Sequence, residues 1–382
     1  MSPLRVLQAV GTLDRGGVET WLLHVLRRVD RRDIEIDFLV HGAASGALTQ
    51  EAVELGAEVL RIGGHRRPGY GRRLERLLRE NRYDILHSHL HFFGGRILRT
   101  AARAGVPVRI AHSHSVRSSL ASSGRFRRAY TRLMGRWIRR YATHRLACSR
   151  PASLALFGEA TGNGADPSTL YCGIELDPFA PGPRLDGGAL RAELGIPPNT
   201  LVIGHVGRFR PVKNHHFILE MASAAASAGL DCSFLLVGDG ELEETIRRRV
   251  RTLGLESRVR FAGARADVPE LMNAVIDVLV LPSLHEGLPL VLMEAQAAGV
   301  PSVVTRTISD EVDVVPGAIV RLSLQESHQR WVQAALQAAR GVSLEHAFDQ
   351  MKGSPFNVNN SAAALCALYR RAAEPHRPVS RL

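Results

Sequence analysis

The sequence lacks paired cysteines and long apolar runs. Its four cysteines, Cys148, Cys172, Cys232 and Cys366, lie far apart and form no Cys-x-x-Cys pair. They are therefore expected to be small buried side chains rather than metal ligands or disulfide partners. No run of about 18 or more apolar residues occurs, which argues against a transmembrane helix. The first residues lack the apolar core of a secretory signal, so we expect a cytoplasmic protein.

Acidic residues are missing from one long stretch of the chain. Between Ile85 and Gly158 there is no Asp or Glu, whereas 14 arginines occur. The rest of the sequence carries 35 basic and 37 acidic side chains, so the net charge of +12 arises from this stretch. A local positive field of this kind predicts an anionic partner such as a phosphate group, a lipid headgroup or a nucleic acid.

An alternating pattern of strands and helices occurs twice along the chain. With 382 residues the chain is longer than one hydrophobic core usually serves. Strand-like apolar runs alternate with helical periodicity from Leu4–Val10 onward, and a second cycle starts at Leu201–Val206. Asp177–Gly188, rich in Pro and Gly, separates the two cycles. The sequence therefore predicts two α/β domains with parallel sheets.

The expected domain boundaries follow from this pattern. We predict a first Rossmann-like domain at residues 1–175, a linker at 176–188 and a second such domain at 189–355. A helix at about residues 356–372 is expected to pack back on the first domain, and residues 374–382 to form a loose tail. Parallel α/β domains bind ligands at the carboxyl ends of their strands, so the two sheets are expected to face a deep interdomain cleft.

The most informative segment runs from Leu281 to Pro301. A buried strand ends at Pro282, a glycine turn follows, and a helix begins around Pro289, where proline is well tolerated. The free backbone N–H groups at such a helix start, together with the helix dipole, suit a diphosphate or a polarised sugar. The residues expected at this anion site are Gly287, Leu288, Pro289 and Leu290.

Two carboxylates frame this site. Glu286 precedes the helix, and Glu294 lies about one turn inside it. A carboxylate accepts two hydroxyl hydrogen bonds, which suits vicinal sugar hydroxyls. Isolated glutamates are usually solvated, but Glu294 lies in an otherwise apolar helix, where a charge requires a partner. The pattern therefore favours a binding role for both.

Other loops carry glycines and cations at matching places. Arg208 and Lys213 follow a strand and precede a helix, where two cations suit a diphosphate leaving group. Gly16 and Gly17 follow the first strand, where glycine lets the backbone approach a ligand closely. The Gly-x-Gly-x-x-Gly pattern is absent there, so a hydride-transferring dinucleotide enzyme is not supported. The strand Val259–Phe261 is followed by a glycine turn at Gly263, which also fits a loop between a strand and a helix.

Together these segments resemble the retaining GT-B glycosyltransferases of family 4. Glu286 and Glu294 match the E-x7-E signature of that family, and Arg208 and Lys213 match its diphosphate clamp. The resemblance implies that Glu286 contacts the transferred sugar, that Glu294 contacts the ribose, and that the base lies near Gly263. It also implies a nucleotide diphosphate sugar as donor, with no cofactor and no metal.

Four segments look most like the exopolysaccharide and capsular-polysaccharide branch of the family. They are Gly17–Trp21, His87–His89, Ala111–His114 and Tyr171–Glu175. The resemblance to this branch implies a UDP-sugar donor and a lipid-linked acceptor.

Histidines follow two of the expected strands. His87, His89 and His91 follow one strand, and His112 and His114 follow another. Imidazoles at alternating positions can ligate a metal, but no acidic residue lies nearby in sequence, so no metal site is predicted. The family places one histidine near the reacting centre, for which His114 is the first candidate and His112 the second. His89 is expected on the acceptor side.

The resemblance also indicates the mechanism. With Glu286 and Glu294 both assigned to binding, no carboxylate pair remains for a double-displacement reaction. Front-face displacement with retention of configuration is implied, in which the protein positions the reactants and stabilises the diphosphate charge.

The densest basic segment is Arg125–Tyr141. Its apolar side chains recur at helical spacing on one face, and most arginines lie off that face. One interpretation is a helix that packs on its own sheet. The other is a contact with an anionic membrane on the inner face of the cell membrane. The candidates for that contact are Arg125, Arg128, Arg132, Arg136, Trp137 and Arg139.

Two other functions are compatible with parts of the sequence. A GT-B sugar-nucleotide epimerase shares the expected fold but does not require Glu286 and Glu294 together with Arg208 and Lys213. A nucleic-acid-binding protein would account for the basic stretch. That stretch contains few aromatic residues suited to base stacking and no known nucleic-acid motif, so no nucleic-acid partner is predicted.

Overall fold

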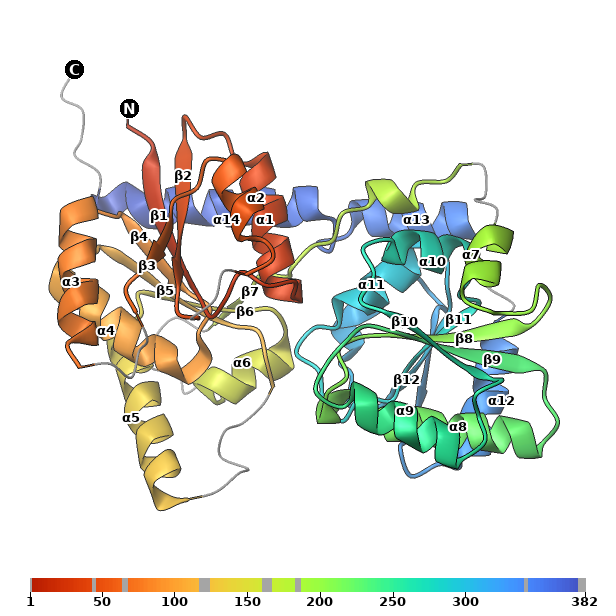
Figure 1. Ribbon diagram of the computed structural model, residues 1–382. Helices are drawn as coiled ribbons and strands as arrows, with labels where there is room; N and C mark the ends of the chain where they lie inside the picture. The colour runs from red at the N-terminus through yellow and green to blue at the C-terminus, as the bar shows by residue number, and fades with distance from the viewer. Residues whose placement is uncertain are drawn as a thin grey trace. The chain divides into compact units, whose positions relative to one another are not determined.

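The computed structural model describes residues 2–42, 46–63, 68–116, 124–159, 167–182, 187–339 and 343–376. The chain divides into two compact units (Figure 1). The first contains Met1–Gly173 and Val358–Leu382, and the second contains Ile174–Asn357. Each unit is built on one sheet whose paired strands run parallel.

The first unit has a seven-stranded sheet in the order β3-β2-β1-β4-β5-β6-β7. The inner strand β1, between β2 and β4, is almost completely buried, which explains its apolar sequence, yet it contains Gln8 with 0% exposure. The strands are β1 (Leu4–Val10), β2 (Ile34–Val40), β3 (Val59–Arg61), β4 (Ile85–Ser88), β5 (Val108–Ser113), β6 (His144–Ala147) and β7 (Ser168–Thr169).

The last long helix of the chain belongs to the first unit. This helix, α14, packs against α1, and Trp21 of α1 donates from Nε1 to the hydroxyl of Ser361 at 3.1 Å. The helices of the unit are α1 (Gly17–Arg28), α2 (Thr49–Glu54), α3 (Tyr70–Asn81), η1 (His91–Phe93), α4 (Gly94–Ala104), α5 (Arg125–Tyr141), α6 (Arg150–Phe157), α14 (Val358–Ala373) and η5 (Glu374–His376).

The apolar face that the sequence predicts for helix α5 is covered over only part of its length. Only its second half is covered, where Met134 and Ile138 are buried. At its start Phe126 is 93% exposed, and Tyr130 and Leu133 are 44% exposed. The helix packs mainly on α4 rather than on the sheet, because Gly95 of α4 admits the backbone of Met134 where any larger residue would collide. Among the described residues, no helix is both long and apolar enough to cross a membrane.

The second unit has a six-stranded sheet in the order β10-β9-β8-β11-β12-β13. Its strands are β8 (Leu201–Val206), β9 (Cys232–Val237), β10 (Val259–Gly263), β11 (Val278–Leu281), β12 (Ser302–Thr305) and β13 (Ile319–Leu322). Its helices are η2 (Asp177–Phe179), α7 (Gly187–Glu193), η3 (Pro211–Lys213), α8 (His215–Ser227), α9 (Glu243–Thr252), α10 (Val268–Ala274), α11 (Leu290–Ala297), η4 (Asp310–Val312), α12 (His328–Ala338) and α13 (Leu344–Gly353).

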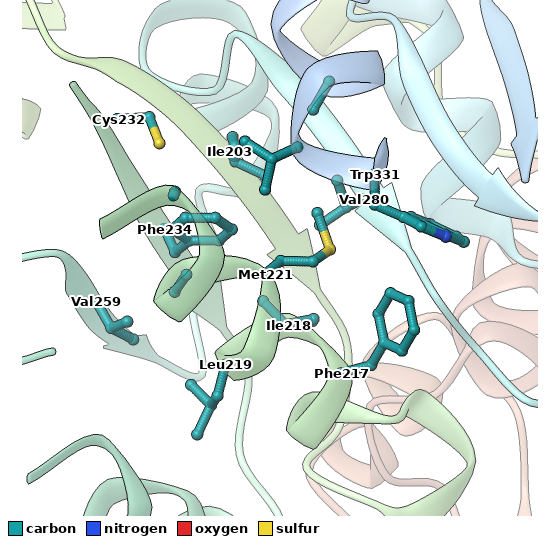
Figure 2. Close-up of a cluster of buried hydrophobic side chains, with 14 of the residues drawn as sticks. Ile203, Phe217, Ile218, Leu219, Met221, Cys232, Phe234, Val259, Val280 and Trp331 are labelled. Atoms are coloured by element: carbon teal, nitrogen blue, oxygen red, sulfur yellow. The ribbon is translucent and has the colours of Figure 1, made fainter. Parts of the chain in front are cut away.

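Helix α8 forms one wall of the core of the second unit (Figure 2). Its side chains Ile218 and Met221 are fully buried among residues of the sheet such as Phe234 and Val280. Trp331 of α12 belongs to the same cluster and is fully buried. Burying such side chains contributes about 1.5–3 kcal/mol each, which fixes α8 and the loop before it on the sheet.

Candidate functional site

Lys213 and Glu286 form an ion pair in the second unit. The Nζ of Lys213 lies 2.7 Å from Oε1 of Glu286, and the two side chains are 17% and 13% exposed. The loops that carry them are joined by backbone contacts. The N–H of Leu284 donates to the carbonyl of Val212 at 2.8 Å, and Asn214 donates from Nδ2 to the carbonyl of Pro282 at 3.1 Å. The structure thus brings together two residues that the sequence separates by 73 positions.

Two glycines fix the loop that carries Arg208. Gly238 and Gly240 have φ values of +135° and +149°, a region that favours glycine. A Cβ on Gly238 would lie 2.3 Å from the carbonyl oxygen of Gly207, and one on Gly240 would lie 2.7 Å from the backbone nitrogen of Phe209. The N–H of Phe209 donates to the carbonyl of Asp239 at 2.6 Å. The glycines therefore let the loop after β9 support the loop after β8.

The remaining donor-side candidates follow β10 and β11. Gly263 ends β10, and its carbonyl accepts from the N–H of Gly238 at 2.8 Å. Helix α11 begins at Leu290 with Pro289 as its N-cap, which confirms the expected helix start. Arg208 is exposed, whereas Gly287 and Leu288 are half-buried. These residues all lie at the carboxyl ends of the strands of one sheet.

Glu294 lies inside α11 in a poorly hydrated place. Burial raises the pKa of its carboxyl group to about 7. Within the described chain, this carboxyl group makes no hydrogen bond. A carboxyl group of this kind is set to accept hydrogen bonds from a ligand, as the sequence-based assignment to a ribose requires.

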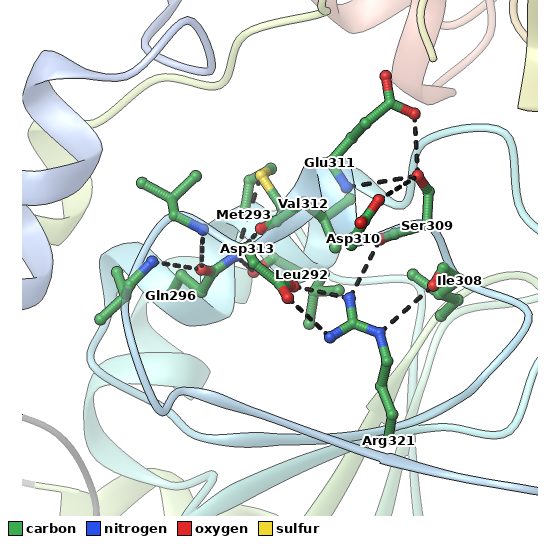
Figure 3. Close-up of polar contacts among 12 residues, drawn as sticks. Leu292, Met293, Gln296, Ile308, Ser309, Asp310, Glu311, Val312, Asp313 and Arg321 are labelled. Atoms are coloured by element: carbon green, nitrogen blue, oxygen red, sulfur yellow. Dashed lines mark hydrogen bonds and ion pairs between the residues drawn. The ribbon is translucent and has the colours of Figure 1, made fainter. Parts of the chain in front are cut away.

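Helix α11 is anchored by the buried side-chain amide of Gln296, two residues after Glu294 (Figure 3). The Nε2 of Gln296 donates to the carbonyl of Val312 at 2.9 Å, and its Oε1 accepts from the N–H groups of Val314 and Val315 at 3.1 and 2.9 Å. Arg321 binds Asp313 through two nitrogens and thereby holds the same loop. These contacts position the helix on which Glu294 lies.

Four histidines gather at the ends of β4 and β5 in the first unit. The Nε2 of His87 lies 3.1 Å from Nδ1 of His112, and the Nδ1 of His89 lies 2.7 Å from Nε2 of His114. Burial lowers the pKa of all four, that of His114 to about 3, so each ring is neutral at neutral pH. The structure therefore places both candidates for the reacting centre beside the acceptor-side candidate His89.

The histidine cluster also has metal-ligand spacing. His87, His89 and His112 each offer one ring nitrogen within 4.8 Å of the others. Within this group, however, Nε2 of His87 and Nδ1 of His112 lie at hydrogen-bond distance from each other, and Nδ1 of His89 lies at that distance from Nε2 of His114.

Gly16 and Gly17 lie in the first unit, between β1 and α1. Gly16 is the N-cap of α1 and Gly17 is its first residue, and no side chain caps this helix start. A Cβ on Gly16 would lie 2.6 Å from Oε2 of Glu19, so glycine at this position makes room for the Glu19 side chain.

The proposed membrane candidates lie on α5. Arg125, Arg128, Arg132, Arg136 and Arg139 are all exposed. Trp137 is half-buried, and the guanidinium of Arg99 lies 4.3 Å from the centre of its ring system. The exposed apolar residues of this helix are Phe126, Tyr130 and Leu133, which belong to the apolar face that the sequence predicts.

Sequence reasoning missed three residues that contact the histidines. Gln8 and the hydroxyl of Tyr369 bond to the cluster from β1 and α14, and Cys172 lies 3.7 Å from Nδ1 of His114. The amide of Gln8 within an apolar strand was an available signal, because a buried amide needs partners. No sequence signal pointed to Tyr369, which lies 361 positions from Gln8.

Two parallel-sheet Rossmann-like domains with these loops define the GT-B glycosyltransferases, and the chain belongs to this class. Residues 188–333 match the family model described as glycosyl transferases group 1, and residues 15–177 match that of glycosyltransferase family 4. The chain is 33% identical over 379 residues to the protein EpsF of Bacillus subtilis (strain 168), with 98% of each chain covered.

Two further comparisons extend this likeness. The chain is 34% identical over 244 residues, or 61% of its length and 60% of the relative's, to an Escherichia coli enzyme. That enzyme is the UDP-Gal:alpha-D-GlcNAc-diphosphoundecaprenol alpha-1,3-galactosyltransferase. The structure of Anabaena HepE in complex with UDP-glucose superposes with a TM-score of 0.80 at 22% identity, covering 96% of this chain and 100% of that one. The likeness to HepE shows the fold.

Proposed function

We propose that this glycosyltransferase moves a sugar from a UDP-sugar donor to a lipid-linked acceptor, with retention of configuration, in exopolysaccharide or capsule biosynthesis. The observation that carries the proposal is the ion pair of Lys213 and Glu286 immediately before α11. It sets a cation and a carboxylate beside a helix N-terminus, which together suit a diphosphate and the sugar attached to it.

The proposed chemistry uses these residues for positioning and charge stabilisation. The bond between the anomeric carbon and the diphosphate oxygen breaks, and the leaving nucleoside diphosphate takes the electron pair. The acceptor oxygen bonds to the same face of that carbon, and its proton passes to the diphosphate. Lys213 and Arg208 balance the charge on the leaving group, while Glu286 holds the sugar hydroxyls and Glu294 the ribose. The protein chain needs no metal for this.

The donor and acceptor classes are supported by relatives. The galactosyltransferase from Escherichia coli is named for a UDP-galactose donor and an acceptor on a diphosphoundecaprenol lipid. HepE has been solved with UDP-glucose. The family assignment favours a transferase over an epimerase of the same fold.

We also propose that α5 contacts an anionic membrane on the inner face of the cell membrane. Phe126 is 93% exposed at the start of this helix, with exposed arginines around it. Exposed apolar side chains with flanking arginines suit the boundary between headgroups and acyl chains. A lipid-linked acceptor would be reached from the same surface.

A thermal-shift titration with UDP, GDP and ADP tests the donor site. At 100 times its dissociation constant, a ligand adds about 2.7 kcal/mol of stability. We expect a shift with UDP that is lost in Arg208→Ala and Glu294→Ala. A shift with GDP or ADP alone would exclude a UDP-sugar donor, and no shift with any of them would contradict the proposed site.

A further inference from the structure

A chain of hydrogen bonds with Gln8 at its centre runs through the first unit. The amide Nε2 of Gln8 donates to the hydroxyl of Tyr369 at 2.7 Å, and its Oε1 lies 2.9 Å from Nε2 of His89. Gln8 and Tyr369 are both fully buried. A side-chain amide donates only at one end and accepts only at the other, so each arm of the chain leaves Gln8 with a fixed direction.

The first arm leads from Gln8 to Cys172. His89 donates from Nε2 to the amide oxygen, so its Nδ1 is the acceptor of a neutral ring. His114, whose Nε2 lies 2.7 Å away, must then donate to it, which leaves Nδ1 of His114 as an acceptor. The thiol of Cys172 faces this atom at 3.7 Å. Burial raises the pKa of this thiol, so it keeps the proton that it donates.

The second arm leads from Gln8 to His112. Tyr369 accepts from Gln8, so its own proton is donated to Nδ1 of His87 at 2.7 Å. His87 then donates from Nε2 to Nδ1 of His112 at 3.1 Å. This direction places the remaining proton of His112 on Nε2.

We propose that Gln8 is a positioning residue that sets the tautomers of His87, His89, His112 and His114. All four carry their proton on Nε2, and His114 presents an acceptor at Nδ1. An amide does not readily pass protons along, so the chain orients these rings rather than conducting protons between them.

The consequence for binding concerns His114, which is half-buried, whereas His112 is 1% exposed. A hydroxyl group of a substrate that replaces the weak thiol contact would donate to Nδ1 of His114. This step rests on the proposed function, but the tautomers do not depend on it.

The test is long-range proton–nitrogen NMR on full-length protein labelled with ¹⁵N-histidine, without substrate. Wild type is expected to show the four rings in the Nε2–H form. Gln8→Leu removes both ends of the amide, so His89 and His114 are expected to become mixtures of tautomers. His87 and His112 are expected to become mixtures as well, because without the amide N–H of Gln8 the hydroxyl of Tyr369 can accept from Nδ1 of His87 as well as donate to it.

Tyr369→Phe is the complementary variant, and it is conservative enough to preserve packing. It is expected to release His87 and His112 into mixtures. A proton on Nδ1 of His114 in wild type would overturn the proposal, as would identical tautomers in all three proteins. A stoichiometric bound metal lost on substitution of His87 would also overturn it, because a nitrogen that ligates a metal cannot accept a hydrogen bond. Nucleotide binding is a separate readout, so either inference can fail alone.

Discussion

The Nζ of Lys213 lies 2.7 Å from Oε1 of Glu286, just before helix α11. Each group neutralises the other in a largely buried place. A diphosphate that enters beside α11 offers Lys213 a second anionic partner and leaves Glu286 able to accept hydrogen bonds. The pair therefore holds both groups ready for a nucleotide sugar.

Replacing Lys213 tests this arrangement. The chain contains only one other lysine, Lys352, so Lys352→Ala is a matched control. We expect Lys213→Ala to lower UDP affinity by tenfold or more, while the control binds UDP as the wild type does. In a double-mutant cycle with Glu286→Gln, chemical unfolding is expected to give a coupling energy of about 1–3 kcal/mol. A coupling energy near zero would show that the pair is not formed in solution.

Glu294 makes stability depend on pH. Its folded pKa of about 7 lies above the ordinary value of 4.5, so the folded state binds the extra proton. The stability that the folded state gains from this proton is fully present below about pH 4.5 and is lost as the pH rises toward and through 7. Relative to Glu294→Gln, the wild type is expected to lose on the order of 3 kcal/mol between pH 5 and pH 8. If urea unfolding gave the same change in the free energy of unfolding between the two pH values for both proteins, the assignment would be contradicted.

The glycines of the loop after β9 are predicted to be intolerant of substitution. Gly240→Ala would add a strained φ and a contact of 2.7 Å with the backbone of Phe209. We expect a loss of about 3 kcal/mol or more in the free energy of unfolding. Gly254→Ala is the control, because its φ is also positive but nothing lies near its Cβ, and it should cost about 1 kcal/mol. Equal losses in the two variants would contradict the close approach.

Membrane contact through α5 is tested by sedimentation with liposomes. Each arginine near an anionic surface contributes about 1 kcal/mol, so changing Arg125, Arg128 and Arg132 to Glu should reduce binding at least a hundredfold. Arg248, Arg249 and Arg251 of α9, changed to Glu, provide a control of equal charge in the second unit. Loss of binding in both variants would indicate a general charge effect. Equal binding of the wild type to neutral and to anionic liposomes would exclude the proposed surface.

Much of the fold could be predicted from the sequence, because parallel strands buried on both faces leave uninterrupted apolar runs. The expected strands Leu4–Val10 and Leu201–Val206 coincide with β1 and β8. The exposure of Phe126 could not be predicted, because periodicity identifies a face without showing what covers it.

The candidate site could be predicted only in part. The loops that carry Arg208, Lys213 and Glu286 were identified from local patterns of glycine, proline and charge. The pairing of Lys213 with Glu286 depends on which strands are neighbours, and β8 lies next to β11 in the sheet. The sequence predicts that the last helix returns to the first domain, but the contact between Gln8 and Tyr369 depends on the exact position at which α14 packs, which no local pattern gives.

The most direct test of the proposed function is transfer itself. The purified protein would be incubated with UDP-galactose or UDP-glucose and a sugar linked to diphosphoundecaprenol, in the presence of a metal chelator. The anomeric configuration of the product would then be determined by proton NMR. We expect UDP release equal to product formed, with the α-configuration of the donor retained. A β-linked product would contradict the retaining mechanism, and no transfer from either donor despite UDP binding would contradict the proposed donor or acceptor.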